Sequence, residues 1–157
     1  MIKKYLYAFL LSMVPIIEMK GAIPLAAAMG IPIQSALIVC MLGNMFPVPF
    51  IILLYGKILK WLGKIKYIGD ALNYFMDKAK AKAEKIGNYE LFGVFLFVAI
   101  PLPGTGAWMG SLVSTVLGLP LKKAFPVIIA GLAVNALIMA FISYGLGSAV
   151  IGLFFVQ

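Results

Sequence analysis

Three long stretches of the chain contain no charged residue. They run from residue 21 to 56, from 91 to 121 and from 124 to 157. Each is longer than the roughly 20 apolar residues that cross a lipid bilayer as one α-helix. A soluble domain keeps about a quarter of its residues charged, whereas only 11% are charged here and the mean hydropathy is +1.09. The sequence therefore predicts an all-α integral membrane protein, with residues 1–157 as a single membrane domain.

The charges that remain are mostly positive and lie between the apolar stretches. The formal net charge is +8, and all 13 basic residues are lysines. Lysines in such positions suit loops that contact anionic lipid headgroups, so we expect membrane lipids as partners and no nucleic acid. The chain has no histidine and one cysteine, Cys40. We therefore expect no metal site and no cofactor.

The two halves of the chain share one pattern. Residues 30–43 (GIPIQSALIVCMLG) align without a gap with residues 118–131 (GLPLKKAFPVIIAG), so that the glycines and the first prolines coincide. Small residues spaced by four recur upstream in both halves: Ala22, Ala26, Gly110 and Ser114. Small residues with this spacing lie on one helix face and allow another helix to approach closely in lipid. The alignment indicates a duplication, with repeats over 1–56 and 90–157.

Each half consists of two short apolar arms and one longer apolar span. We predict a hairpin over 5–30 and a span over 33–56, then a hairpin over 90–118 and a span over 121–147. The predicted hairpin breaks contain Pro15, Gly21, Pro24, Pro101 and Pro103. An arm of about 11 residues rises roughly 16 Å as an α-helix, about half of the hydrocarbon core. Each hairpin is therefore expected to be re-entrant; the alternative is that arm, break and arm form one kinked span.

A re-entrant hairpin followed by one span crosses the membrane once in total. The second repeat would then lie upside down relative to the first, as in the inverted repeats of many secondary transporters. Residues 57–89, rich in lysine with apolar residues at helical spacing, predict an amphipathic helix in the membrane interface. The positive-inside rule places this linker on the cytoplasmic side and both termini outside, although Lys3 and Lys4 argue against that orientation.

Chemistry is expected at the tips of the two hairpins. Glu18 and Lys20 are the charges that lie inside the hydrophobic halves away from a loop or an end, and a charge at bilayer depth needs a partner or water. Gly104, Thr105 and Gly106 form a turn whose backbone amides can attract an anion. If the tips face each other, Glu18 would carry a proton, while Lys20 and the turn would hold a negative group. Alternatively, Glu18 and Lys20 form a structural ion pair, or the tip lies at the water interface.

Three further residues are candidates for lining a central cavity. Asn44 and Asn135 lie within the predicted spans, and Trp108 follows the second tip. The asparagines can equally hydrogen-bond between helices. The tryptophan can equally be a packing aromatic.

The tip sequences resemble a known family. IIEMKGAIPLA (16–26) and FVAIPLPGTGAWMGS (97–111) are similar to the small multidrug export proteins of bacteria and archaea, a distant branch of the DedA/VTT superfamily. The resemblance covers nearly the whole chain and implies two facing re-entrant hairpins in a prokaryotic cytoplasmic membrane, crossed several times. Relatives in the superfamily are linked to lipid movement and proton dependence. They often carry arginines at the second hairpin, which this chain lacks.

Two functions from different classes follow from these observations. The first is a proton-coupled transporter or flippase that moves an amphiphilic, lipid-phosphate or drug-like substrate through a site between the hairpins. The second is a non-transporting scaffold or assembly factor whose small-residue stripes serve oligomerisation. We expect no enzyme, because no nucleophile and base occur together, and a homo-oligomer such as a dimer, because short bundles leave their hairpins exposed.

Overall fold

The computed structural model describes residues 2–62 and 89–146, and these ranges are helical without any strand. The helices are α1 (Ile2–Met13), α2 (Glu18–Ala28), α3 (Ile33–Met45), α4 (Pro47–Leu62), α6 (Tyr89–Ala99), α7 (Ala107–Val116), α8 (Leu121–Ala140) and the π-helix η1 (Phe141–Leu146). Most of the predicted interfacial helix over 57–89 lies outside the described residues. The all-helical prediction is confirmed for the described ranges.

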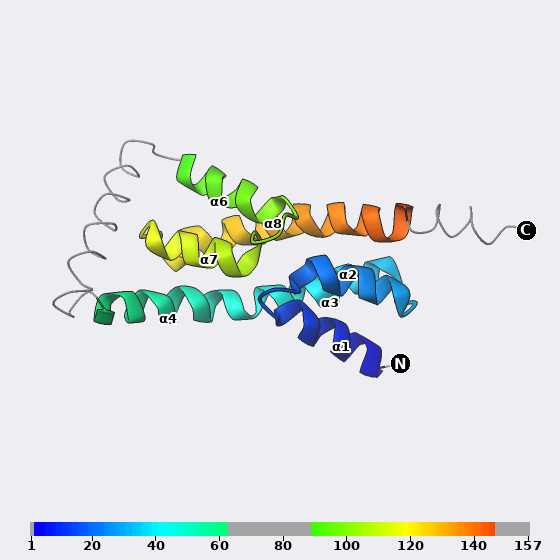
Figure 1. Ribbon diagram of the computed structural model, residues 1–157. Coiled ribbons are helices and arrows are strands. Elements are labelled where there is room, and N and C mark those ends of the chain that lie inside the picture. The colour runs from blue at the N-terminus through cyan, green and yellow to red at the C-terminus, as the bar shows by residue number, and fades with distance from the viewer. Residues whose placement is uncertain (1, 63–88, 147–157) are drawn as a thin grey trace, which may run out of the picture.

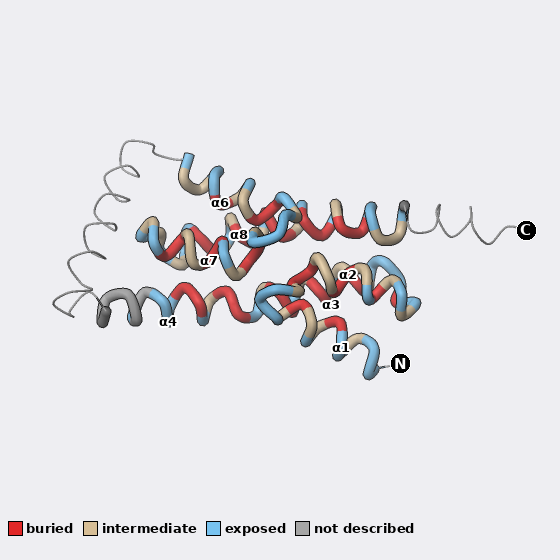
Figure 2. Tube along the Cα trace, viewed as in Figure 1, coloured by how far each residue is buried: buried red, intermediate tan, exposed pale blue. Residues whose placement is uncertain are grey.

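The two halves of the chain have the same order of elements. Helices α1 and α2 pack together and are followed by α3 and α4, while α6 and α7 pack together and are followed by α8 and η1. Figure 1 shows the two hairpins entering from opposite ends of the molecule, with their turns meeting near its middle. The longest helical runs lie beside them, and buried residues follow the faces where helices contact one another (Figure 2).

A glycine-proline turn joins each hairpin to its long helix in the same way. Gly30 and Gly118 have φ angles of 69° and 72°, which favour glycine because it has no Cβ. The amides of Ile31 and Leu119 each donate to a carbonyl five residues earlier, at 2.9 Å in both cases. This bond closes a Schellman motif at the end of each hairpin. The aligned turns therefore have matching backbone structures.

The packing of the first arm against the long helix also matches between the halves. A Cβ added at Gly43 in α3 would overlap the carbonyl oxygen of Phe9 in α1 and the hydroxyl of Ser12. A Cβ added at Gly131 in α8 would lie 2.9 Å from the carbonyl oxygen of Phe95 in α6 and crowd Val98. The aligned glycines thus receive the backbone of the first arm in both halves. Close helix approach through small residues is the packing mode expected in lipid.

Replacing Gly43 with Ala is expected to destabilise the protein by about 1–3 kcal/mol, because the added methyl group overpacks the contact between α1 and α3. Gly93 in α6 is the matched control, since a Cβ there meets nothing within 4 Å. Gly93→Ala should be neutral or stabilise by up to about 1 kcal/mol, because alanine favours a helix. Thermal unfolding in detergent measures both variants, and equal melting temperatures would contradict the contact.

The outer surface of the described helices is strongly apolar. Large hydrophobic side chains are exposed on several of them, including Leu6, Ile38, Phe50, Phe92 and Leu137. Two helical runs are long and apolar enough to cross a membrane within the described ranges, Ile33–Tyr55 and Leu121–Gly145, with mean hydropathies of 2.3 and 2.4. These runs correspond to the two predicted spans. Apolar side chains on an outer surface are typical of a protein surrounded by lipid.

The first long helix has one irregular position, at its prolines. The run over 33–56 was predicted as one span, and one apolar helical run covers Ile33–Tyr55. Within it, α3 ends at Met45 and α4 begins at Pro47, while Phe46 between them keeps a helical φ of −55° and ψ of −47°. Pro47 and Pro49 have no amide hydrogen, so the carbonyls four residues before them lose their helical partners. Pro47 occupies the first position of α4, where a proline is tolerated because that amide has no helical partner.

The predicted break in the first hairpin was too long. Gly21 and Pro24 were placed in the break, but both lie inside α2, which already begins at Glu18. The amide of Gly21 donates to the carbonyl of Ile17 at 2.9 Å and closes the first turn of this helix. The helical backbone supplies the φ angle that proline requires, so Pro24 removes one hydrogen bond without ending the helix. Pro15 lies in the actual break.

Candidate functional site

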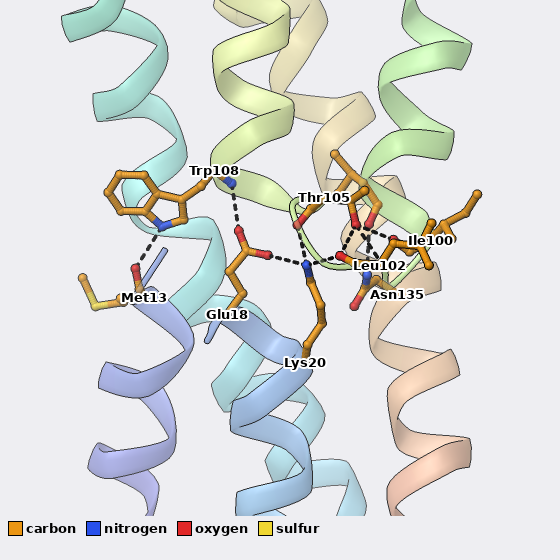
Figure 3. A network of polar contacts seen from close by, with 9 residues as sticks. Met13, Glu18, Lys20, Ile100, Leu102, Thr105, Trp108 and Asn135 are labelled. Atoms are coloured by element: carbon orange, nitrogen blue, oxygen red, sulfur yellow. Dashed lines mark hydrogen bonds and ion pairs between the residues drawn. The ribbon is translucent and has the colours of Figure 1, made fainter. Parts of the chain in front are cut away.

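The turns of the two hairpins contact each other at the centre of the molecule. We call residues 13–20 the first tip and residues 100–108 the second tip. Figure 3 shows side chains of each tip reaching toward the other. The polar contacts between them come from Glu18, Lys20 and Trp108.

Glu18 at the start of α2 is almost completely buried, with 2% of its surface exposed. Its Oε1 accepts a hydrogen bond of 3.1 Å from the backbone amide of Trp108, in the first turn of α7. The residue before α7, Gly106, has no side chain to cap the helix. The carboxylate of the first half therefore caps a helix of the second half, where the helix dipole favours negative charge.

Both residues at the contact between Glu18 and Gly106 have backbone angles that are uncommon for residues with a side chain. Glu18 has a φ angle of +46°, an uncommon value for a residue with a Cβ. Gly106 has a φ angle of +119°, and a Cβ added there would overlap Oε2 of Glu18. Strained backbone persists where the surroundings hold it, and it is frequent at functional sites. The carboxylate is thus held against a backbone position that only glycine can occupy.

Lys20 also joins the two tips, as a donor where Glu18 is an acceptor. Its ammonium group lies 3.6 Å from Oε2 of Glu18 and is partly exposed. It donates to the carbonyl oxygen of Leu102 at 2.7 Å and to that of Thr105. Oε2 of Glu18 is buried and accepts no hydrogen bond, so Lys20 supplies the positive charge beside it.

The second tip is held in shape by Thr105. Its hydroxyl lies 2.7 Å from the carbonyl oxygen of Ile100 and accepts the amide of Leu102 at 3.1 Å. Its own amide donates to the carbonyl oxygen of Leu102 at 3.2 Å. These bonds give the backbone groups of Ile100 and Leu102 partners inside the turn, where no helix supplies them.

The contacts of the second tip match those expected for an anion-binding turn only in part. The turn over 104–106 was expected to offer free amides to an anion, but the amide of Thr105 donates to the carbonyl oxygen of Leu102, and the amide of Trp108, just after the turn, donates to Glu18. The tip also presents carbonyl oxygens to Lys20. Within the described part of the chain, the amides of Gly104 and Gly106 form no hydrogen bond.

A pocket of about 650 Å³ lies between the tips. Its walls include Pro15, Ile16, Lys20, Pro101, Pro103, Gly104, Thr105 and Trp108. Glu18 is not part of the wall; its carboxylate lies behind Lys20. The pocket is therefore mostly apolar, with the ammonium group of Lys20 as its charged element.

The predicted cavity-lining residues occupy different places. Trp108 lines the pocket, and its indole N–H donates to the carbonyl oxygen of Met13 at 2.9 Å. Asn135 and Asn44 are buried but do not line the pocket. The side-chain amide of Asn135 donates to the carbonyl oxygen of Val98 at 3.0 Å, which joins α8 to α6. Oδ1 of Asn44 accepts no hydrogen bond.

The cross-tip contacts involve aligned positions of the two halves. At the spacing that aligns the rest of the repeat, Glu18 falls on Gly106 and Lys20 falls on Trp108. Glu18 and Gly106 both have positive φ angles at a helix start. Lys20 and Trp108 both donate from a side chain to backbone carbonyls of the opposite tip. Extending the sequence alignment upstream by a few residues would have paired these positions.

The fold and the site together define an all-helical membrane protein with a polar centre between two helical hairpins. The family model described as "Putative small multi-drug export protein" matches residues 18–138. This range covers most of the chain, so the protein belongs to that family, as the resemblance of the tips predicted. The family's description is that of an exporter rather than an enzyme. Comparisons with curated proteins and with solved structures give no significant match. The link to the DedA/VTT superfamily stays a prediction.

Proposed function

We propose that the protein is a proton-coupled transporter or flippase that moves an amphiphilic substrate through the pocket between the two tips. Glu18 is the proton-carrying residue, and Lys20 holds an acidic group of the substrate. The observation behind this proposal is the buried carboxylate of Glu18, which joins the two halves beside an open pocket. Family membership supports export as the general activity.

The proposed arrangement in the membrane is an inverted repeat of re-entrant hairpins. The arms α1, α2, α6 and α7 have 12, 11, 11 and 10 residues. Helices of that length rise about 15–18 Å, so none crosses a hydrocarbon core about 30 Å thick. The tips then meet near mid-depth, where irregular backbone needs protein around it. In broken-helix transporters, the substrate site lies at this depth.

The proposed location is the cytoplasmic membrane of a prokaryote, with several crossings and with lipids as partners. The end of α4 and the start of α8 lie at one end of the molecule in Figure 1, and the N-terminus lies at the other. Lys122 and Lys123 in the first turn of α8 belong to the former end, as does Lys57 in the last part of α4. The positive-inside rule makes that end cytoplasmic.

A proton on Glu18 would weaken the contact between the tips. The neutral acid has no full charge for Lys20 and is a poorer acceptor for the amide of Trp108. Burial favours the neutral acid, whereas the amide of Trp108 and the ammonium group of Lys20 favour the carboxylate. Protonation therefore releases Lys20 toward the pocket, where an acidic substrate group can replace the carboxylate as its partner.

The test is transport by purified protein in liposomes. Fluorescent amphiphiles, including a lipid phosphate, are placed on both leaflets, and a membrane-impermeant quencher reports the fraction that reaches the outer leaflet. We expect exchange that depends on a pH gradient and is absent from protein-free liposomes. Folded protein that gives no exchange for lipid-like and drug-like probes alike would refute the proposed function.

The scaffold alternative is disfavoured by the position of the small-residue stripes. Ala22, Ala26, Gly110 and Ser114 are buried within the single chain. These faces already contact other helices of the same molecule and are not exposed for oligomerisation. A homo-oligomer would have to use the exposed apolar surfaces instead, and a dimer stays a prediction that crosslinking in intact membranes tests.

A further inference from the structure

A second pocket, of about 310 Å³, lies next to the site and is apolar. It is lined by Met13, Phe46, Pro47, Phe50, Leu54 and Trp108, among others. Phe46, Phe50 and Leu54 are more than half exposed on the outer surface. The pocket therefore opens from the lipid-facing side of α3 and α4. We call it the apolar pocket, and the one between the tips the central pocket.

The apolar pocket lies at the junction of α3 and α4. Pro47 begins α4 and is buried, while Phe46 and Phe50 lie on either side of it and their rings are 5.5 Å apart. Pro47 and Pro49 each leave a carbonyl oxygen of the preceding turn without its helical hydrogen bond. The junction lies beside the end of α1, since Met13 is also part of the wall.

Trp108 lines both pockets, so they meet at its side chain. The side chain is half-buried and is anchored by one hydrogen bond, from the indole N–H to the carbonyl oxygen of Met13. Its backbone amide is bound to Glu18. The residue between the two pockets is therefore connected directly to the carboxylate that joins the tips.

We propose that the apolar pocket binds the hydrocarbon chain of the same amphiphile whose acidic group lies beside Lys20, with Trp108 as the gate between the two parts. This inference rests on the proposed function and adds the path by which the substrate arrives from the lipid. The two pockets match the two parts of an amphiphile. The central pocket contains an ammonium group, and the apolar pocket is lined by apolar side chains and Tyr55. Burial of the hydrocarbon chain there removes apolar surface from water and favours binding.

The test is quenching of Trp108 fluorescence in a Trp61→Phe protein, which leaves Trp108 as the only tryptophan. The protein is placed in phosphatidylcholine vesicles and titrated with dodecyl phosphate that carries two bromine atoms at the chain end. We expect saturable quenching that excess unbrominated dodecyl phosphate reverses. Brominated dodecane, which has no acidic group, should quench without saturation.

Two adjacent leucines of α4 provide the matched variants. Leu54 lines the apolar pocket and is 60% exposed, whereas Leu53 is 54% exposed and does not line it. Leu54→Asn places a polar group in the pocket and should raise the half-saturating concentration about tenfold. Leu53→Asn introduces the same amide into lipid and should leave that concentration unchanged.

Equal effects of the two variants, or quenching that never saturates, would overturn the inference. The binding measurement does not depend on transport, so the two proposals fail separately. Transport without saturable quenching would support the proposed function and refute binding of the hydrocarbon chain in the apolar pocket. Saturable quenching sensitive to Leu54→Asn in a protein that transports nothing would support the pocket and refute the proposed function.

Discussion

Glu18→Gln is expected to reduce pH-gradient-dependent exchange to the level of protein-free liposomes. Glutamine keeps a carbonyl oxygen that can accept the amide of Trp108, so the cap on α7 is preserved. The glutamine amide does not ionise, so it cannot carry a proton, and it has no negative charge to attract the ammonium group of Lys20. That group lies 3.6 Å from the carboxylate of Glu18. The same liposome assay measures the loss.

Glu90→Gln is the matched control for that variant. Glu90 lies in the first turn of α6, about 15 Å along the helix from the second tip. Its neutralisation changes the net charge equally and should leave exchange intact. If Glu18→Gln kept normal pH-dependent exchange in correctly folded protein, Glu18 would not be the proton carrier, and the ion pair with Lys20 would be structural.

Gly106→Ala is expected to destabilise the protein by about 2–5 kcal/mol and to abolish exchange. The backbone at Gly106 has a φ of +119°, and a side chain there costs about 1–3 kcal/mol in strain. The added Cβ would also overlap the carboxylate of Glu18, which must move away from the amide of Trp108. Thermal unfolding in detergent and the liposome assay measure the two effects.

Gly104→Ala separates backbone strain from the overlap. Gly104 also has a positive φ, +80°, but a Cβ there meets nothing within 4 Å. It should cost about 1–2 kcal/mol and retain exchange. If the two variants behaved alike, the contact between Gly106 and Glu18 would have no role beyond the conformation of the turn.

The arms and the long helices could be located from the sequence because they depend on local properties. Apolar runs too short to cross a bilayer, separated by Pro15 or by Pro101 and Pro103, predicted short helices with breaks between them. The recurring glycine-proline turns indicated that the two halves share a plan. The boundaries were less accurate, because Gly21 and Pro24 disfavour a helix locally but are accommodated inside α2.

The first long span was predicted, but the irregular position within it was not. Pro47 and Pro49 lie inside an apolar run that was long enough for one span. Proline within a membrane helix is compatible with a continuous span when neighbouring helices compensate. Local rules therefore could not show that Pro47 would lie beside a pocket.

By itself, the sequence determined that the chain is helical and apolar, that its halves share one pattern, and that Glu18 and Lys20 are the charges requiring a partner. These properties follow from composition and periodicity, which act along the chain. Only the tertiary structure decided which partners they have: Glu18 caps α7, and Lys20 donates to carbonyl oxygens of the second tip. Such contacts join residues more than 80 positions apart, and their geometry depends on how the two hairpins pack together.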